Sequence, residues 1–134
     1  MKVWIGYGSE HSANLVIIGK FESAGAAKST LDTLTEATNI ALADEAAGRL
    51  KAGEVTKNFS KDQLEFYQRT NLALDPEQLL YEFHARVEGD RVVITTEESE
   101  INSLLKALLH GGAKIEVYSA HDHGGPYGRR TKTG

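Results

Sequence analysis

The chain has 134 residues, a formal net charge of −4, five histidines and no cysteine. This length suits one domain, with a core that buries roughly two-thirds of the unfolded chain's surface. The absence of cysteine excludes disulfides, thiolate nucleophiles, zinc fingers and iron–sulfur clusters. No apolar run approaches the roughly 18 residues of a membrane span, and the N-terminus does not resemble a signal peptide. The composition therefore predicts a cytoplasmic protein with no membrane partner.

The charge is distributed unevenly along the chain. Residues 124–134 read GGPYGRRTKTG and hold three basic side chains and no acidic one. Residues 1–123 hold 12 basic and 19 acidic side chains, so they carry −7 and the tail carries +3. The tail has almost no apolar surface to offset the entropy of ordering. We predict a single domain over residues 1–123 and a flexible, basic, glycine-rich tail over 124–134, which could alternatively dock on an acidic partner.

The first third of the chain indicates two strands and a long helix. Val3, Ile5 and Tyr7 alternate with other residues in strand periodicity, and residues 15–18 form a β-branched apolar run. Only a polar, turn-like stretch separates the two strands, so they are expected to pair as a hairpin. Ser23 is a suitable N-cap for a helix that reaches about residue 47.

The middle of the chain predicts a second, shorter helix. Ser60 and Gln63 have the spacing of a capping box, and Leu64 and Tyr67 share one helical face. The helix is expected to stop before Pro76, because a residue that precedes proline avoids the α region. A further helical turn could begin at Pro76.

The last third predicts a hairpin, a helix and a strand. Residues 83–87 and 92–96 alternate around a tight turn at 88–91, which is the clearest hairpin signal in the chain. An amphipathic helix is expected over residues 98–110, with Gly111 and Gly112 ending it. Alternation over residues 115–119 predicts the final strand.

The predicted order is therefore β-β-α-α-β-β-α-β. Without the first strand and the second helix, βαββαβ remains, which is the order of a ferredoxin-like fold. We predict an α+β protein with a ferredoxin-like core, a mostly antiparallel sheet and helices on one face. The extra N-terminal strand would pair with the sheet edge or with the strand that follows it.

This topology would bring three polar segments to one end of the sheet: residues 9–12, 96–98 and 121–123. His121 and His123 alternate along a strand and so project from one face. With His11 and a carboxylate they could hold a divalent metal, although no cofactor at all is the simpler expectation.

Metal-free chemistry at the same place would use the histidines as bases. His11 or His121 could act as a general base oriented by a carboxylate, for which Glu10, Glu97 and Asp122 are the candidates. Ser9, Ser12 and Glu97 could contact a ligand. The alternative is that these residues only satisfy the polar backbone groups of turns.

The sheet face opposite the helices carries aromatic side chains in this prediction. His84 lies between Phe83 and Ala85 and so points away from the helices, on the face expected for Trp4 and Tyr118. Such a face favours a homodimer, and Trp4, His84 and Tyr118 could also contact a ligand or be no more than scattered surface residues. Nucleic-acid binding is disfavoured by the acidic body.

Two functions remain open from the sequence alone. The leading hypothesis is a small cytoplasmic binding protein, for a protein or small-molecule ligand, that self-associates through its open sheet face. The alternative is a small enzyme of hydrolase or lyase type, metal-dependent or not, with a histidine and carboxylate site at the sheet end.

Overall fold

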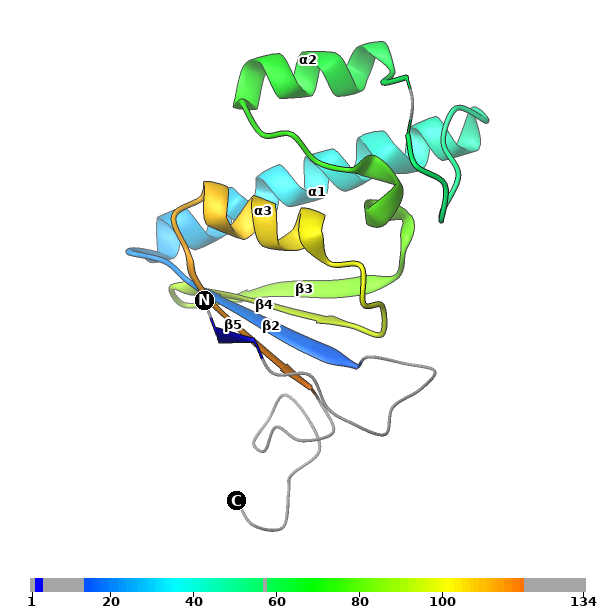
Figure 1. Ribbon diagram of the computed structural model, residues 1–134. Helices are drawn as coiled ribbons and strands as arrows, with labels where there is room; N and C mark the ends of the chain where they lie inside the picture. Colours follow the sequence, from blue (N-terminus) through cyan, green and yellow to red (C-terminus); the bar gives the residue numbers. More distant parts are fainter. Residues whose placement is uncertain (1, 4–13, 57, 120–134) are drawn as a thin grey trace.

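The computed structural model describes residues 2–3, 14–56 and 58–119 as an α+β fold (Figure 1). Its elements in chain order are β1 (Lys2–Val3), β2 (Leu15–Lys20), α1 (Ala24–Ala46), α2 (Lys61–Thr70), η1 (Pro76–Leu80), β3 (Phe83–Glu88), β4 (Arg91–Thr96), α3 (Asn102–His110) and β5 (Lys114–Ser119). Within the described residues, every helix is too short or too polar to serve as a membrane span.

Four antiparallel strands form the body of the sheet in the order β5-β2-β4-β3, and β1 extends it beyond β5. The central strand β2 pairs with β4 and β5, so that Ile17 lies opposite both Ile94 and Val117. These three side chains are fully buried. The run of β-branched residues in β2 is explained by this central position, since it has neighbours on both sides.

The expected N-terminal hairpin is wrong. β1 pairs in parallel with β5, with Lys2 opposite Glu116, and does not pair with β2. The sequence signal that suggested a hairpin was only the polar stretch between two strand patterns, which cannot specify a partner. The other expectation for this strand, that it pairs at the sheet edge, is confirmed.

Helices α1 and α3 lie over one face of the sheet, and the core fills the space between (Figure 1). The Ser23 hydroxyl caps α1 as predicted, since it accepts a hydrogen bond from the backbone N–H of Ala26 at 3.0 Å. Leu34 of α1 and Leu108 of α3 are buried against the strands. Helix α3 begins at Asn102 rather than at residue 98, because residues 97–101 form the connection from β4.

Two glycines explain how neighbouring elements join. The hairpin between β3 and β4 turns at Gly89, which has a φ of +63 and takes this conformation without the strain of a side chain. Gly111 follows α3, where an added Cβ would lie 2.0 Å from the hydroxyl of Thr30. Only glycine therefore lets the end of α3 pass this close to α1.

Helix α2 lies outside the layer of helices that covers the sheet. It stands on the side of α1 that faces away from the strands, as Figure 1 shows. Phe66 is its single buried residue. The turn predicted at Pro76 is confirmed as the 3-10 helix η1, which packs beside α1. The chain thus forms a sheet, a helical layer and one further helix above it.

Candidate functional site

Of the three polar segments predicted to gather at one end of the sheet, the structure describes only residues 96–98. The first residue of β2, Leu15, lies opposite both Thr96 and Ser119, so the ends of β4 and β5 do meet there. A hollow of about 440 Å³ opens beside it. Its described lining is mostly polar and consists of Asn14, Leu15, Glu82, His84, Thr95, Thr96, Glu97 and Glu98.

Most residues of the predicted histidine site lie outside the described residues. These are Ser9, Glu10, His11, Ser12, His121 and His123. The catalytic and metal-binding roles assigned to them therefore stay predictions. Within the described part of the chain, no three histidine or acidic side chains are placed to hold a metal ion. The tail at 124–134 and Trp4 also lie outside the described residues.

The open sheet face carries a row of four residues that crosses the sheet. His84, Thr95, Val16 and Tyr118 lie side by side in the register of the strands. The Tyr118 hydroxyl donates to Glu116, and this hydrogen bond, together with partial burial, raises the pKa of Tyr118 above its ordinary value. Val16 in the same row is fully buried, although no described helix lies on this side.

A second hollow, which the sequence did not predict, lies between α1 and α2. This groove has a volume of about 280 Å³, and its described lining holds no charged side chain. Phe59, Leu64 and Tyr67 border it, although their exposed fractions are 46%, 48% and 46%. The remaining lining residues are Ala37, Ile40, Gln63, Phe66, Leu72, Ala73, Leu74, Pro76 and Leu79. We call this hollow the α1–α2 groove.

A buried carboxylate fixes one end of α2 above α1. Asp44 of α1 is 1% exposed and accepts hydrogen bonds at both oxygens. Its Oδ2 receives the Ser60 hydroxyl at 2.7 Å and the Gln63 Nε2 at 2.6 Å. Its Oδ1 receives the Arg49 guanidinium at 3.0 Å and 3.2 Å. Because every oxygen is satisfied and a cation is present, the carboxylate is stable despite its burial.

The same carboxylate decides which way the amide of Gln63 points. A carboxylate only accepts hydrogen bonds, so the Gln63 nitrogen must be the atom that faces Asp44. The amide oxygen Oε1 then points elsewhere. It is buried and has no hydrogen-bond partner among the described residues. A buried acceptor without a partner costs about 1–3 kcal/mol, so the contact with Asp44 is made at the expense of this oxygen.

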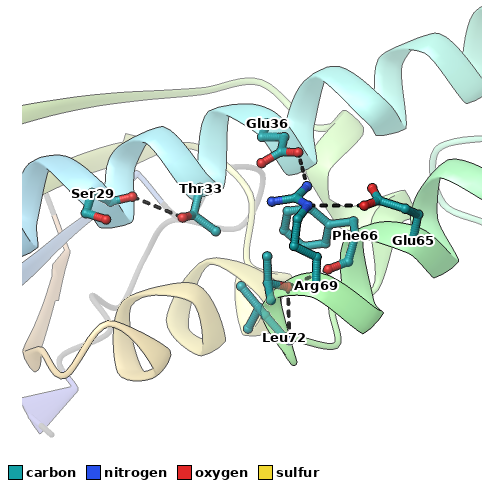
Figure 2. Close-up of polar contacts among 8 residues, drawn as sticks. Ser29, Thr33, Glu36, Glu65, Phe66, Arg69 and Leu72 are labelled. Carbon is teal, nitrogen blue, oxygen red and sulfur yellow. Dashed lines mark hydrogen bonds and ion pairs between the residues drawn. The ribbon is translucent and has the colours of Figure 1, made fainter.

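The other end of α2 is tied to α1 by ion pairs near the surface. Figure 2 shows the Arg69 guanidinium between Glu36 of α1 and Glu65 of its own helix, beside the ring of Phe66. The guanidinium carbon lies 5.7 Å from the centre of that ring. These side chains are about half exposed, so each ion pair contributes little in water. Together the two ties hold α2 at both ends and leave the groove between them.

The groove was not predicted, because Leu64 and Tyr67 indicated only one apolar face on α2. Leu64 and Tyr67 do share a face, as predicted, but that face borders the groove and is half exposed. The buried residue is Phe66, two positions after Leu64, and residues two apart do not share a helical face. The available signal was the width of the apolar part of α2, since Leu64, Phe66 and Tyr67 together span more than one helical face and all three line the groove.

Comparisons with known proteins return a family and no function. The family model DUF6375, described as a family of unknown function, matches residues 1–126. No curated protein is significantly similar to the chain. No solved structure is significantly similar either.

Proposed function

The chain belongs to the DUF6375 family, and we propose that it is a small binding domain whose α1–α2 groove holds an uncharged, apolar molecule. The observation that carries this proposal is the half-exposed state of Phe59, Leu64 and Tyr67 around a hollow whose described lining holds no charged side chain. Concave, mostly apolar hollows with few polar groups are the usual form of small-molecule sites. A groove of about 280 Å³ is near the lower limit for such sites, which favours a small ligand.

The exposed apolar side chains of the described residues gather at this groove. Six large hydrophobic residues are exposed in the described part of the chain, and three of them border this groove. Burial of apolar surface contributes about 25 cal/mol per Å², so a ligand that covers these three side chains gains from each of them. Single exposed hydrophobic residues are ordinary, but a cluster around a hollow indicates a binding surface.

The direct test is a fluorescence titration with N-phenyl-1-naphthylamine, an uncharged apolar dye. The full chain should enhance and blue-shift the dye emission in a saturable way. Leu64→Asp places a charge on the groove wall at a half-exposed position that the fold tolerates, and it should weaken binding at least about tenfold. Leu109→Asp is the matched control, because Leu109 is 52% exposed on α3 and does not line the groove.

Two results would contradict the proposal. One is an absence of saturable enhancement with the unmodified chain. The other is an equal loss of binding in the Leu64→Asp and Leu109→Asp variants, because this would mean that the dye binds elsewhere or follows general unfolding. Circular dichroism of both variants checks that the fold is retained.

We also propose that the sheet and its covering helices belong to the ferredoxin-like class. The order β5-β2-β4-β3, with every neighbouring pair antiparallel, supports this assignment. The alternation of β2-α1-β3-β4-α3-β5 along the chain supports it as well. Helix α2 and strand β1 would then be additions to that core.

Self-association through the open sheet face is a second proposal, favoured by one observation. No described helix covers this face, and Ile18, Thr95 and Tyr118 on it are partly exposed. Sedimentation velocity of the full chain at micromolar concentration should then show a dimer that Ile18→Lys converts to a monomer. A monomer in the unmodified chain removes this proposal and leaves the groove proposal intact.

A further inference from the structure

From the free edge of β3 and a hollow beside it, we infer that this edge binds an extended peptide segment of a partner protein as an additional strand of the sheet. The segment carries apolar side chains at alternate positions and charged side chains between them. The inference does not depend on the α1–α2 groove, because the described lining of that groove includes no residue of β3.

The backbone of β3 has hydrogen-bonding groups that point away from the sheet. β3 is the last strand in the order, so β4 is its single neighbour among the described strands. A two-residue turn joins them and places Glu88 opposite Arg91, which makes this the first hydrogen-bonded pair of the hairpin. Such pairs recur at every second residue, so the N–H and C=O groups of Phe83, Ala85 and Val87 point outward. They have no backbone partner elsewhere in the described chain.

A hollow lies beside this edge, on the side of the sheet that the helices cover. It has a volume of about 420 Å³, and residues of α1, of η1 and of the start of β3 line it. Phe83 and Ala85 border it and are only partly buried, and Leu42 of α1 borders it with 46% of its surface exposed. Residues directly opposite each other on paired strands point to the same side. The side chains of an added strand opposite Phe83 and Ala85 would therefore enter this hollow.

The helical side of β3 lacks the features that commonly protect a free edge. Natural sheets block such edges with proline, a bulge or a charge that points inward. The six residues of β3 include no proline, and their register with β4 runs without a bulge. Phe83, Ala85 and Val87, which point to the helical side, are all apolar. Extended peptides dock on edges of this kind through main-chain hydrogen bonds, and pockets for their alternate side chains give specificity.

The charges on the other side of β3 favour a foreign peptide over a second copy of this chain. The register that pairs the whole strand antiparallel with itself is centred on Ala85. It would place Glu82 opposite Glu88 of the second copy, and His84 opposite Arg86. Like charges directly opposite each other destabilise a strand pair. A complementary peptide instead has a basic residue opposite each glutamate and acidic residues opposite His84 and Arg86.

The experiment uses two isomeric peptides with the sequence Lys-Val-Glu-Val-Glu-Val-Lys and blocked ends. One is methylated at the backbone nitrogens of both glutamates, which leaves the valine N–H groups free to pair with β3. The other is methylated at the second and third valines, which blocks that edge. In an NMR titration of the full chain, the first should bind saturably, with the largest shifts over residues 83–87, and at least about tenfold more tightly than the second. Equal binding of the isomers, or no saturable binding of either, overturns the inference.

The charge argument has its own probe. The peptide Glu-Val-Lys-Val-Lys-Val-Glu, methylated at both lysine backbone nitrogens, has the same composition with the charges exchanged. It should bind about three- to tenfold more weakly than the glutamate-methylated peptide, because it places like charges opposite Glu82 and Glu88. Tighter binding of the exchanged peptide would overturn the assigned charge pattern of the partner.

Variants of the chain connect the binding to the edge and to the hollow. Ala85→Pro removes an outward N–H and leaves the hydrogen bonds to β4 in place, so the fold should be retained and peptide binding lost. Leu42→Asp places a charge in the hollow and should weaken binding at least about fivefold. Leu109→Asp is the matched control, because Leu109 is 52% exposed and does not line the hollow.

Two results with these variants would overturn the inference. One is peptide binding that Leu42→Asp and Leu109→Asp weaken equally, which stays decisive even if Ala85→Pro does not fold. The other is a dimer of the unmodified chain, seen by sedimentation velocity, that Ala85→Pro converts to a folded monomer. The edge would then belong to a second copy of the chain rather than to a foreign peptide.

Discussion

The α1–α2 groove and the open sheet face distribute apolar surface in opposite ways. In the groove, Leu64 and Tyr67 are about half exposed, and the described lining holds no charged side chain. On the open face, Val16 and Val93 are fully buried, although no described helix covers them. By the register of the strands, this face also carries charged side chains, namely Lys20, Arg86, Glu88, Arg91, Lys114 and Glu116.

Within the described residues, this difference shows that a sheet face without a covering helix need not be the most exposed apolar surface. The sheet was expected to be the self-associating surface, because the predicted helices cover only one side of it. Among the residues that the structure describes, the larger exposed apolar cluster lies on the helical side, between α1 and α2. The sharpest way to separate the two regions is to disturb the attachments of α2 and compare the result with changes on the sheet.

Phe66→Ala should have the largest effect. Phe66 is 5% exposed and belongs to the core cluster, so its truncation should lower the free energy of unfolding by about 3–5 kcal/mol. Leu64→Ala, two residues away and 48% exposed, should change it by less than about 1 kcal/mol. Urea unfolding measures both variants. Equal losses would show that α2 buries both of its faces, contrary to this structure.

Asp44→Ala should have the next largest effect. It removes the acceptor shared by Arg49, Ser60 and Gln63, and the expected loss is about 2–4 kcal/mol in the free energy of unfolding. Hydrogen exchange should accelerate most in α2. Asp32→Ala on the same helix is the control, because the Asp32 side chain is 68% exposed. A loss no larger than that of the control would mean that Asp44 does not anchor α2.

Arg69→Met should have a smaller effect at the other end of α2. Its ion pairs with Glu36 and Glu65 are half exposed and screened by water, so the expected loss in the free energy of unfolding is well below that of Asp44→Ala. The difference from the unmodified chain should shrink in 0.5 M sodium chloride, because salt screens exposed charges. A loss that is large and independent of salt would indicate that packing on Phe66, rather than charge, is the main contribution of Arg69.

Glu116→Gln should have the smallest effect and reports on the open face. The hydrogen bond to Glu116 raises the pKa of Tyr118, so its removal should lower this pKa toward its ordinary value. A raised pKa contributes stability that is fully present below the ordinary value near 10 and is lost as the pH rises through the folded value. A spectroscopic titration of the variant should show the lowered pKa of Tyr118. Unfolding measured at alkaline pH should show a smaller loss of stability than in the unmodified chain.

Tyr81 provides an internal reference for that titration. Its pKa is raised by a separate hydrogen bond to Glu100, and this pKa should not move in Glu116→Gln. Equal shifts of both tyrosines would point to a general change in structure instead.

Local chemistry made much of the fold predictable. Ser23 and Ser60 begin their helices as their capping patterns indicate, and the hairpin turns at Gly89. Pairing between strands that are distant in the sequence was harder to predict. β1 lies beside β5, more than one hundred residues along the chain, and no local pattern contains that information.

The candidate sites illustrate the same limit. The meeting of Leu15, Thr96 and Ser119 followed from topology and is confirmed, whereas the histidine roles placed around it remain predictions. The groove lies between α1 and α2, and the contacts of 2.6–2.7 Å that join Asp44 to Ser60 and Gln63 across these helices are not encoded in sequence patterns. Capping-box spacing even suggested another role for Gln63, which instead reaches Asp44 with its side chain.

The most direct test of the groove is an NMR titration of the isotopically labelled full chain with indole. The account predicts saturable shifts of the backbone amides of Phe59, Leu64 and Tyr67, which are lost in Leu64→Asp and kept in Leu109→Asp. Shifts that gather instead on Ile18, Thr95 and Tyr118, or an absence of saturable shifts, would contradict it.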